Sequence, residues 1–247
     1  MLFQRRCRRV ESQTAQAYRA YFEAAKAAFL ARVPGTSATE LKDGVVVARP
    51  AKEDGIIKVP GGLIHHWTAT VFFSGVSVQK AVDVSQAYSR YPLVYQSVAA
   101  SSVLGHDGDT FHVLMRLKER QAGLTVVLQV RSTVVYQHLS DILVCTLSNA
   151  DEIREVEDPD GAHERLLPAG QDRGYLWRAN VLTSFLEQNG GVIVQTETLG
   201  LSRTFPYMLG WILEPIARRL GRKSVETSLQ EFYRAIRLPP PAPASSK

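Results

Sequence analysis

The chain has 247 residues, of which 45% are hydrophobic, and a formal charge of +5 at pH 7. This length and composition suffice for one medium-sized domain with a substantial core. Cys7 and Cys145 provide neither a disulfide framework nor the spacing of metal ligands, and no stretch approaches the roughly 18 apolar residues of a membrane span. Composition therefore argues against a disulfide scaffold, a cysteine-ligated metal centre and a helical membrane span.

Much of the excess positive charge sits near the N-terminus, in Arg5, Arg6, Arg8 and Arg9. A secretory signal needs an apolar stretch behind its basic residues, whereas the polar residues 11–13 follow here. We therefore expect a cytoplasmic protein as the sequence is written, and an exported one if the start site is misassigned. Each basic residue near an anionic bilayer contributes about 1 kcal/mol of binding, so this segment either contacts a membrane peripherally or only aids solubility.

The first predicted element is a helix from Ser12 to Val33, which Ser12 can cap and Pro34-Gly35 ends. Short strands are expected at 45–49 and 56–59, before the turn at 60–62. The apolar face of the helix comprises Tyr18, Phe22, Phe29 and Val33.

From residue 63 the chain reads as a series of strands, interrupted by helix-like residues 77–87 and a tyrosine-rich bend at 88–95. Apolar and polar residues alternate sharply within 111–118, which is typical of an antiparallel sheet with one covered and one solvated face. Residues 158–173 are expected to form a surface loop. The strands are predicted at 63–73, 96–104, 110–120, 123–136, 142–155, 175–188 and 191–202.

One long helix is predicted near the end of the chain, from Tyr207 to Arg237, and a Pro, Ala and Ser tail follows it. Pro215 and Gly221 should bend or loosen this helix, at a cost of roughly 3 and 1 kcal/mol, and two helices that meet at 219–222 are the alternative. Opposite a basic face, the helix carries an apolar stripe that suits either a lid over a cavity or a plug that fills a core. The stripe comprises Leu209, Ile212, Leu213, Ile216 and Leu220, and then Val225, Leu229, Phe232 and Ile236.

This order of elements resembles the helix-grip fold of the START-like superfamily, also called SRPBCC or birch-allergen-like. Three segments are similar to a bacterial subgroup of it: 59–67 (VPGGLIHHW), 172–180 (DRGYLWRAN), and 201–203 (LSR) followed by 209–211 (LGW). The resemblance implies an α+β fold in which a curved antiparallel sheet wraps around the long C-terminal helix, with an additional N-terminal helix. The expected divisions are a basic segment 1–11, a helix and linker 12–43, the START-like domain 44–238 and a disordered tail 239–247.

The resemblance also implies an apolar cavity between the sheet and the C-terminal helix, which would bind a hydrophobic small molecule or lipid without a cofactor or metal. We expect a non-enzymatic carrier or sensor; the alternatives are a cavity enzyme of the polyketide cyclase or aromatase type and a protein or membrane interaction module. No nucleic acid partner is expected, since no aromatic and basic RNA-binding motif occurs. Candidate wall residues, each also explicable as ordinary core, are Trp67, Val71, Phe73, Phe111, Val113, Met115, Val126, Leu128, Trp177, Phe185, Ile212 and Ile216.

Three polar residues are candidates to orient a ligand: His65, Arg178 and Glu197. His65 and His66 are adjacent on a strand and point to opposite faces, so they cannot share one metal. Arg178 would pair with Glu197 across two strands if the register allows, either on a solvated face or in a buried polar cluster. Motifs of the common hydrolases and nucleotide-binding enzymes are absent, and if the protein is an enzyme, His65 and Glu197 are the expected acid–base pair.

Overall fold

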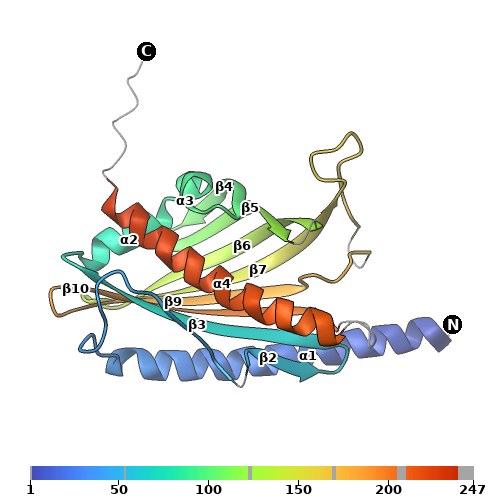
Figure 1. Ribbon diagram of the computed structural model, residues 1–247, viewed down its shortest axis with the longest axis horizontal. Coiled ribbons are helices and arrows are strands. Elements are labelled where there is room, and N and C mark those ends of the chain that lie inside the picture. The colour runs from blue at the N-terminus through green and yellow to red at the C-terminus, as the bar shows by residue number, and fades with distance from the viewer. Residues whose placement is uncertain (1, 53, 122–123, 169–170, 205–209, 239–247) are drawn as a thin grey trace, which may run out of the picture.

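The structure, a computed structural model, describes residues 2–52, 54–121, 124–168, 171–204 and 210–238 (Figure 1). Side chains are described for the same residues except 2–12, 121, 124, 210–218 and 220. The helices are α1 (Leu2–Arg32), α2 (Val78–Gln86), α3 (Tyr91–Val94) and α4 (Gly210–Arg237), with short 3₁₀ turns η1 (Val33–Gly35) and η2 (Tyr88–Arg90). The strands are β1 (Val47–Pro50), β2 (Ile56–Val59), β3 (Gly62–Ser74), β4 (Val98–Asp107), β5 (Thr110–Gln121), β6 (Leu124–Ser140), β7 (Leu143–Glu157), β8 (Arg165–Leu166), β9 (Arg178–Gln188) and β10 (Gly191–Arg203).

The strands form one curved antiparallel sheet in the order β1-β3-β10-β9-β7-β6-β5-β4, with β2 and β8 paired to β3 and β7 (Figure 1). The long central strands are joined by short turns, as the alternation of apolar and polar residues predicted. α4 crosses one face of this sheet, and α1 lies along the other face. The predicted α+β helix-grip fold with an added N-terminal helix is therefore confirmed.

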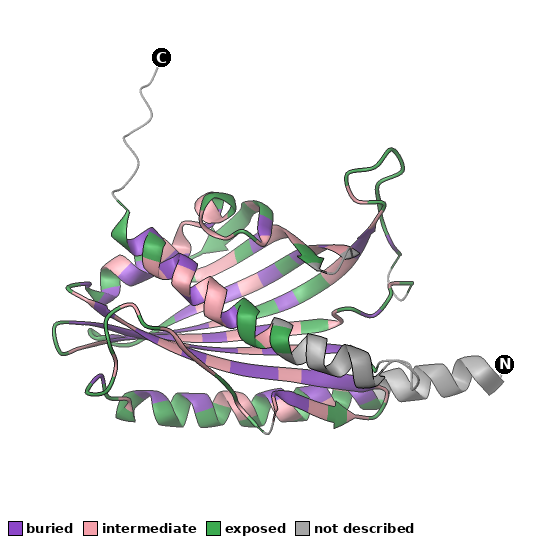
Figure 2. Ribbon diagram, viewed as in Figure 1, coloured by how far each residue is buried: buried purple, intermediate pink, exposed green. Residues whose placement is uncertain are grey.

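Each helix covers its own apolar core, and β3 contributes to both because successive side chains of a strand point to opposite faces. Trp67 and Phe73 belong to the core under α4, whereas Ile64 belongs to the core under α1. Figure 2 shows buried and intermediate residues along this strand, and none of its residues is exposed. Because both of its faces are covered, both histidines of the strand lie inside the protein or nearly so.

The C-terminal half of α4 fills the core as a plug. Phe232 packs against Phe73 with ring centroids 5.7 Å apart and against Phe185 at 6.1 Å. The predicted stripe residues of this half, Val225, Leu229, Phe232 and Ile236, are all buried. The side chains of Leu209, Ile212, Leu213, Ile216 and Leu220 lie outside the described part of the structure, so the first half of the stripe stays a prediction.

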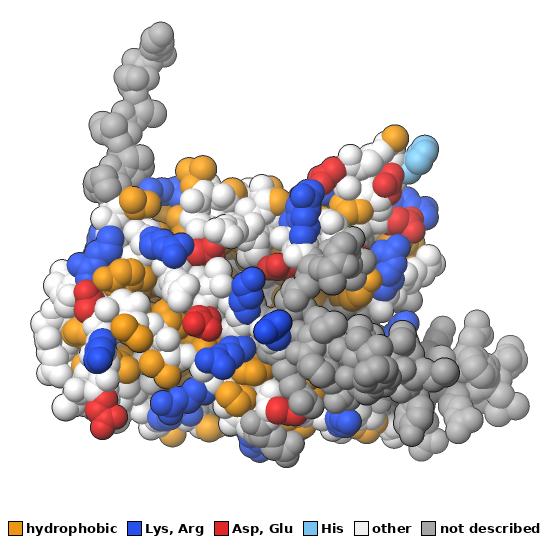
Figure 3. Space-filling model, viewed as in Figure 1, with side chains coloured by type: hydrophobic (Ala, Val, Ile, Leu, Met, Phe, Trp, Pro, Cys, Tyr) orange, Lys and Arg blue, Asp and Glu red, His pale blue; other side chains and the backbone are white. Residues whose placement is uncertain are grey.

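α4 is one continuous helix, and the alternative of two helices is wrong. Gly221 does not break it, and this glycine lies so close to the sheet that a Cβ there would collide with the Trp67 indole. On its outer side Arg219, Arg222 and Lys223 are exposed, and Figure 3 shows basic side chains over this helix between hydrophobic groups.

Several predicted boundaries differ from the structure, and two of these differences have an evident cause. α1 begins at Leu2 and not at Ser12, because residues 2–12 contain no helix breaker and several good helix formers, so the helix continues through the expected capping position. β9 begins at Arg178 and not at Tyr175, because Trp177 donates its backbone N–H to Leu201 before the regular ladder starts. The predicted helix at 77–87 is confirmed as α2, with Ser77 Oγ accepting a hydrogen bond from the Lys80 N–H.

Candidate functional site

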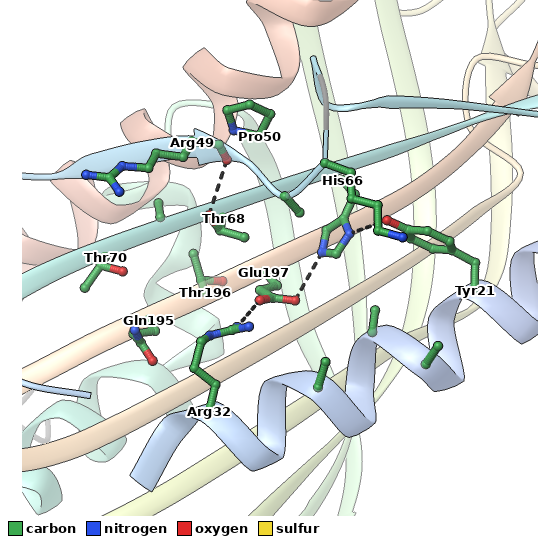
Figure 4. A pocket seen from close by; sticks show the side chains of 16 residues that line it. Tyr21, Arg32, Arg49, Pro50, His66, Thr68, Thr70, Gln195, Thr196 and Glu197 are labelled. Atoms are coloured by element: carbon green, nitrogen blue, oxygen red, sulfur yellow. Dashed lines mark hydrogen bonds and ion pairs between the residues drawn. The ribbon is translucent and has the colours of Figure 1, made fainter. Parts of the chain in front are cut away.

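A pocket of about 480 Å³ lies between α1 and the sheet face that this helix covers (Figure 4). Its walls come from α1, from the segment Arg49–Lys52 at the end of β1, from β3 and from β10. A pocket of this size is within the range of about 300–1,000 Å³ that is usual for small-molecule sites. It was not predicted: the expected cavity was on the opposite face of the sheet.

The sequence of α1 explains why a pocket remains beneath it. Its large apolar residues, among them Tyr18, Phe22 and Phe29, pack into the core on the sheet. The neighbouring stripe is Tyr21, Ala25, Ala28 and Arg32, at spacings of four, three and four that keep them on one side of a helix. The two alanines in the middle are too short to reach the sheet, so they leave space between the longer residues at the ends.

The floor of the pocket is a chain of hydrogen bonds that runs from α1 to β3, on to β10 and back to α1. Tyr21 Oη lies 2.9 Å from His66 Nδ1, and His66 Nε2 lies 3.1 Å from Glu197 Oε2. Glu197 Oε1 accepts a hydrogen bond from Arg32 Nη2. Both central residues are buried, at 5% exposure for His66 and 4% for Glu197, while the Arg32 side chain is half exposed.

Every contact in this chain can pair a donor with an acceptor. With a proton on Nε2, the His66 ring donates to Glu197, and its Nδ1 exchanges a hydrogen bond with the Tyr21 hydroxyl. Burial raises the pKa of Tyr21, and the Glu197 carboxylate raises it further, so this hydroxyl stays a donor at neutral pH. The buried carboxylate thus has partners on both oxygens, which offsets its cost of desolvation.

The predicted pair of His65 and Glu197 is wrong, because the two side chains lie on opposite faces of the sheet. His65 faces away from α1, and its Nε2 lies 2.8 Å from Ser202 Oγ. Burial lowers the pKa of His65, since desolvation disfavours the charged ring. The histidine that does meet Glu197 is its neighbour His66. Only the register of β3 against β10, which sequence reasoning could not supply, decides between the two.

The predicted cross-strand pair of Arg178 and Glu197 is also wrong. Arg178 stands opposite Leu201, whereas Glu197 stands opposite Leu182, so the two residues are four positions apart along the ladder. Arg178 is exposed and donates from Nη1 to the carbonyl of Trp177.

A buried polar cluster nevertheless exists on the sheet face under α1, but it does not include Arg178. Asn180 is buried under α1, where its side chain accepts from Tyr18 Oη at 2.9 Å and donates to Asn149 Oδ1 at 3.0 Å. It lies on the same face as Glu197 on the adjacent strand, but the partners of the carboxylate come from β3 and α1.

The candidate wall residues fall into three groups on the structure. Trp67, Val71, Phe73, Val113 and Phe185 are buried in the core under α4, and the partly exposed Phe111 and Met115 pack against it. Val126 and Leu128 are partly exposed on the same sheet face, opposite Glu119 and Leu117 of β5.

Trp177 does not lie on the sheet face under α4. It packs against the core under α1, and its Nε1 donates to Asp172 Oδ1 at 2.9 Å. Its assignment to the wall under α4 is therefore wrong, because the regular alternation of β9 does not extend to this residue. Ile212 and Ile216 lie outside the residues whose side chains are described.

Within the described residues, no three His, Cys, Asp or Glu side chains are placed to bind a metal ion together. None of the helices in the described part of the chain combines the length and apolarity that a membrane crossing requires.

Comparison with known proteins shows similarity in structure but not in sequence. No family model matches the sequence, and no curated protein matches it. A STAR-related lipid transfer protein from Xanthomonas axonopodis (fragment 25–204) superposes with a TM-score of 0.52 at 16% identity, over 79% of this chain and 100% of that one. Human StAR-related lipid transfer protein 5 superposes with a TM-score of 0.53 at 13% identity, over 92% of this chain and 98% of that one. The chain therefore has the START-like, or SRPBCC, helix-grip fold.

Proposed function

We propose that the protein binds a hydrophobic small molecule or lipid, without catalysing a reaction, between α4 and the sheet face that it crosses. The proposal is carried by a row of apolar side chains on that face that stay partly exposed. Met115, Leu117, Val126 and Leu128 lie there on two adjacent strands, paired as Met115 with Val130 and Leu117 with Leu128.

The row is the continuation of a surface that is buried elsewhere. Toward the other end of the same two strands, Val113, Val134 and Tyr136 are in the core covered by α2 and the C-terminal half of α4. Covering the remaining apolar area would stabilise a complex by about 25 cal/mol for each Å² removed from water. Methionine and leucine side chains in such a row adapt to apolar ligands of different shape.

Buried tyrosines lie farther along the same face, beyond the covered residues Val113 and Val134. Tyr88 Oη lies 3.0 Å from Tyr136 Oη, which also lies 3.1 Å from Ser85 Oγ. Burial raises the pKa of both tyrosines, so their hydroxyls stay neutral. These hydroxyls are the polar groups at the covered end of this face, where they could orient the polar end of a long amphipathic ligand that reaches them from the row.

The similar structures support the same class of ligand. Both are named lipid transfer proteins, and this chain spans nearly the whole of each. Their names describe those proteins, and the row on β5 and β6 is the feature of this chain on which a test should be made.

The test is binding of a fluorescent fatty acid to the intact protein and to two variants of β5. Leu117→Arg places a charge in the apolar row and should weaken binding at least tenfold, because a buried charge must be desolvated. Leu114→Arg is the matched control: Leu114 lies on the other face of the same strand and is also partly exposed. Equal binding by both variants, or no binding by the intact protein, would contradict the proposal.

A further inference from the structure

The pocket of about 480 Å³ described above lies on the opposite side of the sheet from the proposed hydrophobic site, and the proposed function does not use it. We propose that this pocket, beneath α1, binds a small organic oxyanion, meaning a carboxylate or a phosphate monoester on a short apolar body. The inference goes beyond the proposed function, since the apolar row on β5 and β6 contributes no residue to this pocket and the two sites lie on opposite faces of the sheet.

Charge around the pocket favours an anion. Glu197 is the one acidic side chain among its described lining residues, and its charge is balanced by Arg32. Arg49 and Lys52 also line the pocket, and neither forms an ion pair with another described residue. Two positive charges therefore remain at the pocket without a counterion from the described residues.

Arg49 and Lys52 can contribute to anion binding in different ways. Arg49 is an exposed residue of β1, and a guanidinium can hold both oxygens of a carboxylate or phosphate. The Lys52 ammonium lies 5.6 Å from the centre of the Tyr21 ring, so its position over the pocket is held by a cation–π contact. Figure 4 shows Arg49 on β1 and Arg32 on α1, with Thr70 and Gln195 between the two segments.

Polar groups of the sheet lie between these charges. Thr70 and Gln195 line the pocket on adjacent strands, in direct register with one another (Figure 4). Gln195 Oε1 accepts a hydrogen bond from Thr36 Oγ1 at 3.1 Å, which turns its amide nitrogen into the free donor of the side chain. A hydroxyl and an amide donor beside two cations are the contacts that an oxyanion needs.

Between Tyr21 and Arg32, the α1 side of the pocket is apolar. Ala24, Ala25 and Ala28 offer only methyl groups, so they contact a hydrocarbon or aromatic body without competing for its acidic group. The buried chain of Tyr21, His66 and Glu197 already satisfies its own hydrogen bonds. It therefore acts as a fixed floor and leaves the anion to the two cations at the rim.

The test is a titration of the full-length ¹⁵N-labelled protein with phenyl phosphate, with phenylacetate and with the neutral 2-phenylethanol. At least one anion should bind about tenfold more tightly than the alcohol and shift the backbone amides of Ala24, Ala28, Thr70 and Gln195. Preference for phenyl phosphate would assign a phosphate monoester to the site, and preference for phenylacetate a carboxylate.

Two variants locate the binding. The double substitution Arg49→Gln with Lys52→Gln should weaken anion binding about tenfold, while Arg120→Gln with Arg131→Gln, which removes the same charge from exposed positions of β5 and β6, should leave it within twofold. Ala28→Phe fills the pocket from an exposed position of α1 and should abolish anion binding at an unchanged melting temperature.

Three results would overturn the proposal: equal affinity for the anions and the alcohol, equal loss in the two double variants, or full affinity in Ala28→Phe. A set of shifted amides confined to β5 and β6 would also overturn it, because the anions would then occupy the hydrophobic site. That last outcome leaves the proposed function standing, so the two proposals fail separately.

Discussion

His66 Nε2 lies 3.1 Å from Glu197 Oε2, and both side chains are buried between α1 and the sheet. This contact joins two adjacent strands diagonally, because Glu197 stands opposite Thr68 in the ladder and His66 is two residues further along β3. The Tyr21 and Arg32 contacts attach α1 to the same pair from both ends. The charge of Glu197 is therefore part of what holds the N-terminal helix on the sheet.

Glu197→Gln should lower the free energy of unfolding by about 1–3 kcal/mol, measured by chemical denaturation. The amide has the shape of the carboxylate but no charge and only one acceptor oxygen, so the ion pair with Arg32 is lost, and the –NH2 group can be satisfied only if the His66 proton moves to Nδ1 and the Tyr21 hydroxyl becomes the acceptor. Glu152→Gln, at an exposed position of β7, is the control and should change stability by less than about 0.5 kcal/mol. A denaturation midpoint for Glu197→Gln equal to that of the control would show that the buried carboxylate contributes nothing to stability.

The pattern of residues was sufficient to predict the sheet and the long helices at the two ends of the chain. It predicted that His65 and His66 point to opposite faces, and this holds. Periodicity carries this information because side-chain direction alternates locally along a strand. The long helix at the end of the chain was found for the same reason.

The site itself could not be predicted, because its contacts depend on register and on the position of α1. A shift of the register of β3 against β10 changes which residue meets Glu197, and the local sequence does not record that choice. The missed signal was in α1: the stripe of Tyr21, Ala25, Ala28 and Arg32 has two small residues between two polar ones. Such a stripe indicates space beneath a helix that otherwise packs closely.

Gly221→Ala should destabilise the protein by about 1–3 kcal/mol, although alanine is the better helix former by roughly 1 kcal/mol. The added Cβ would collide with the rigid Trp67 indole, whose Nε1 is buried and has no hydrogen-bond partner among the described residues. Ser224→Ala on the exposed side of α4 is the control, and it should stabilise the helix by a few tenths of a kcal/mol. A stabilised Gly221→Ala variant would mean that α4 is not held against Trp67.

His65 should make the protein less stable in mild acid. Burial lowers its pKa in the folded state below the ordinary value of 6.5. As the pH falls below that value, His65 of the unfolded chain therefore binds a proton while His65 of the folded chain stays neutral. With respect to His65, the free energy of unfolding then has its full value above pH 6.5 and declines as the pH falls, by at most about 1.4 kcal/mol per pH unit. The melting temperature of His65→Gln, which keeps a donor for Ser202, should fall less between about pH 7 and pH 5 than that of the unchanged protein. The exposed His112→Gln serves as the control, and a profile of His65→Gln that parallels it would exclude His65 as the acid-sensitive group.

Cys145 should resist thiol reagents until the protein unfolds. It is 3% exposed within the core under α1, and burial raises its pKa to about 11. At pH 8 only about one thiol in a thousand would be ionised, and the thiolate is the reactive form. In a Cys7→Ser background, labelling by 5,5′-dithiobis(2-nitrobenzoic acid) should be at least a hundredfold slower in the native state than in denaturant. Rapid labelling of the native protein would show that α1 detaches from the sheet on the timescale of the reaction, in which case the pocket beneath it would be a transient rather than a fixed feature.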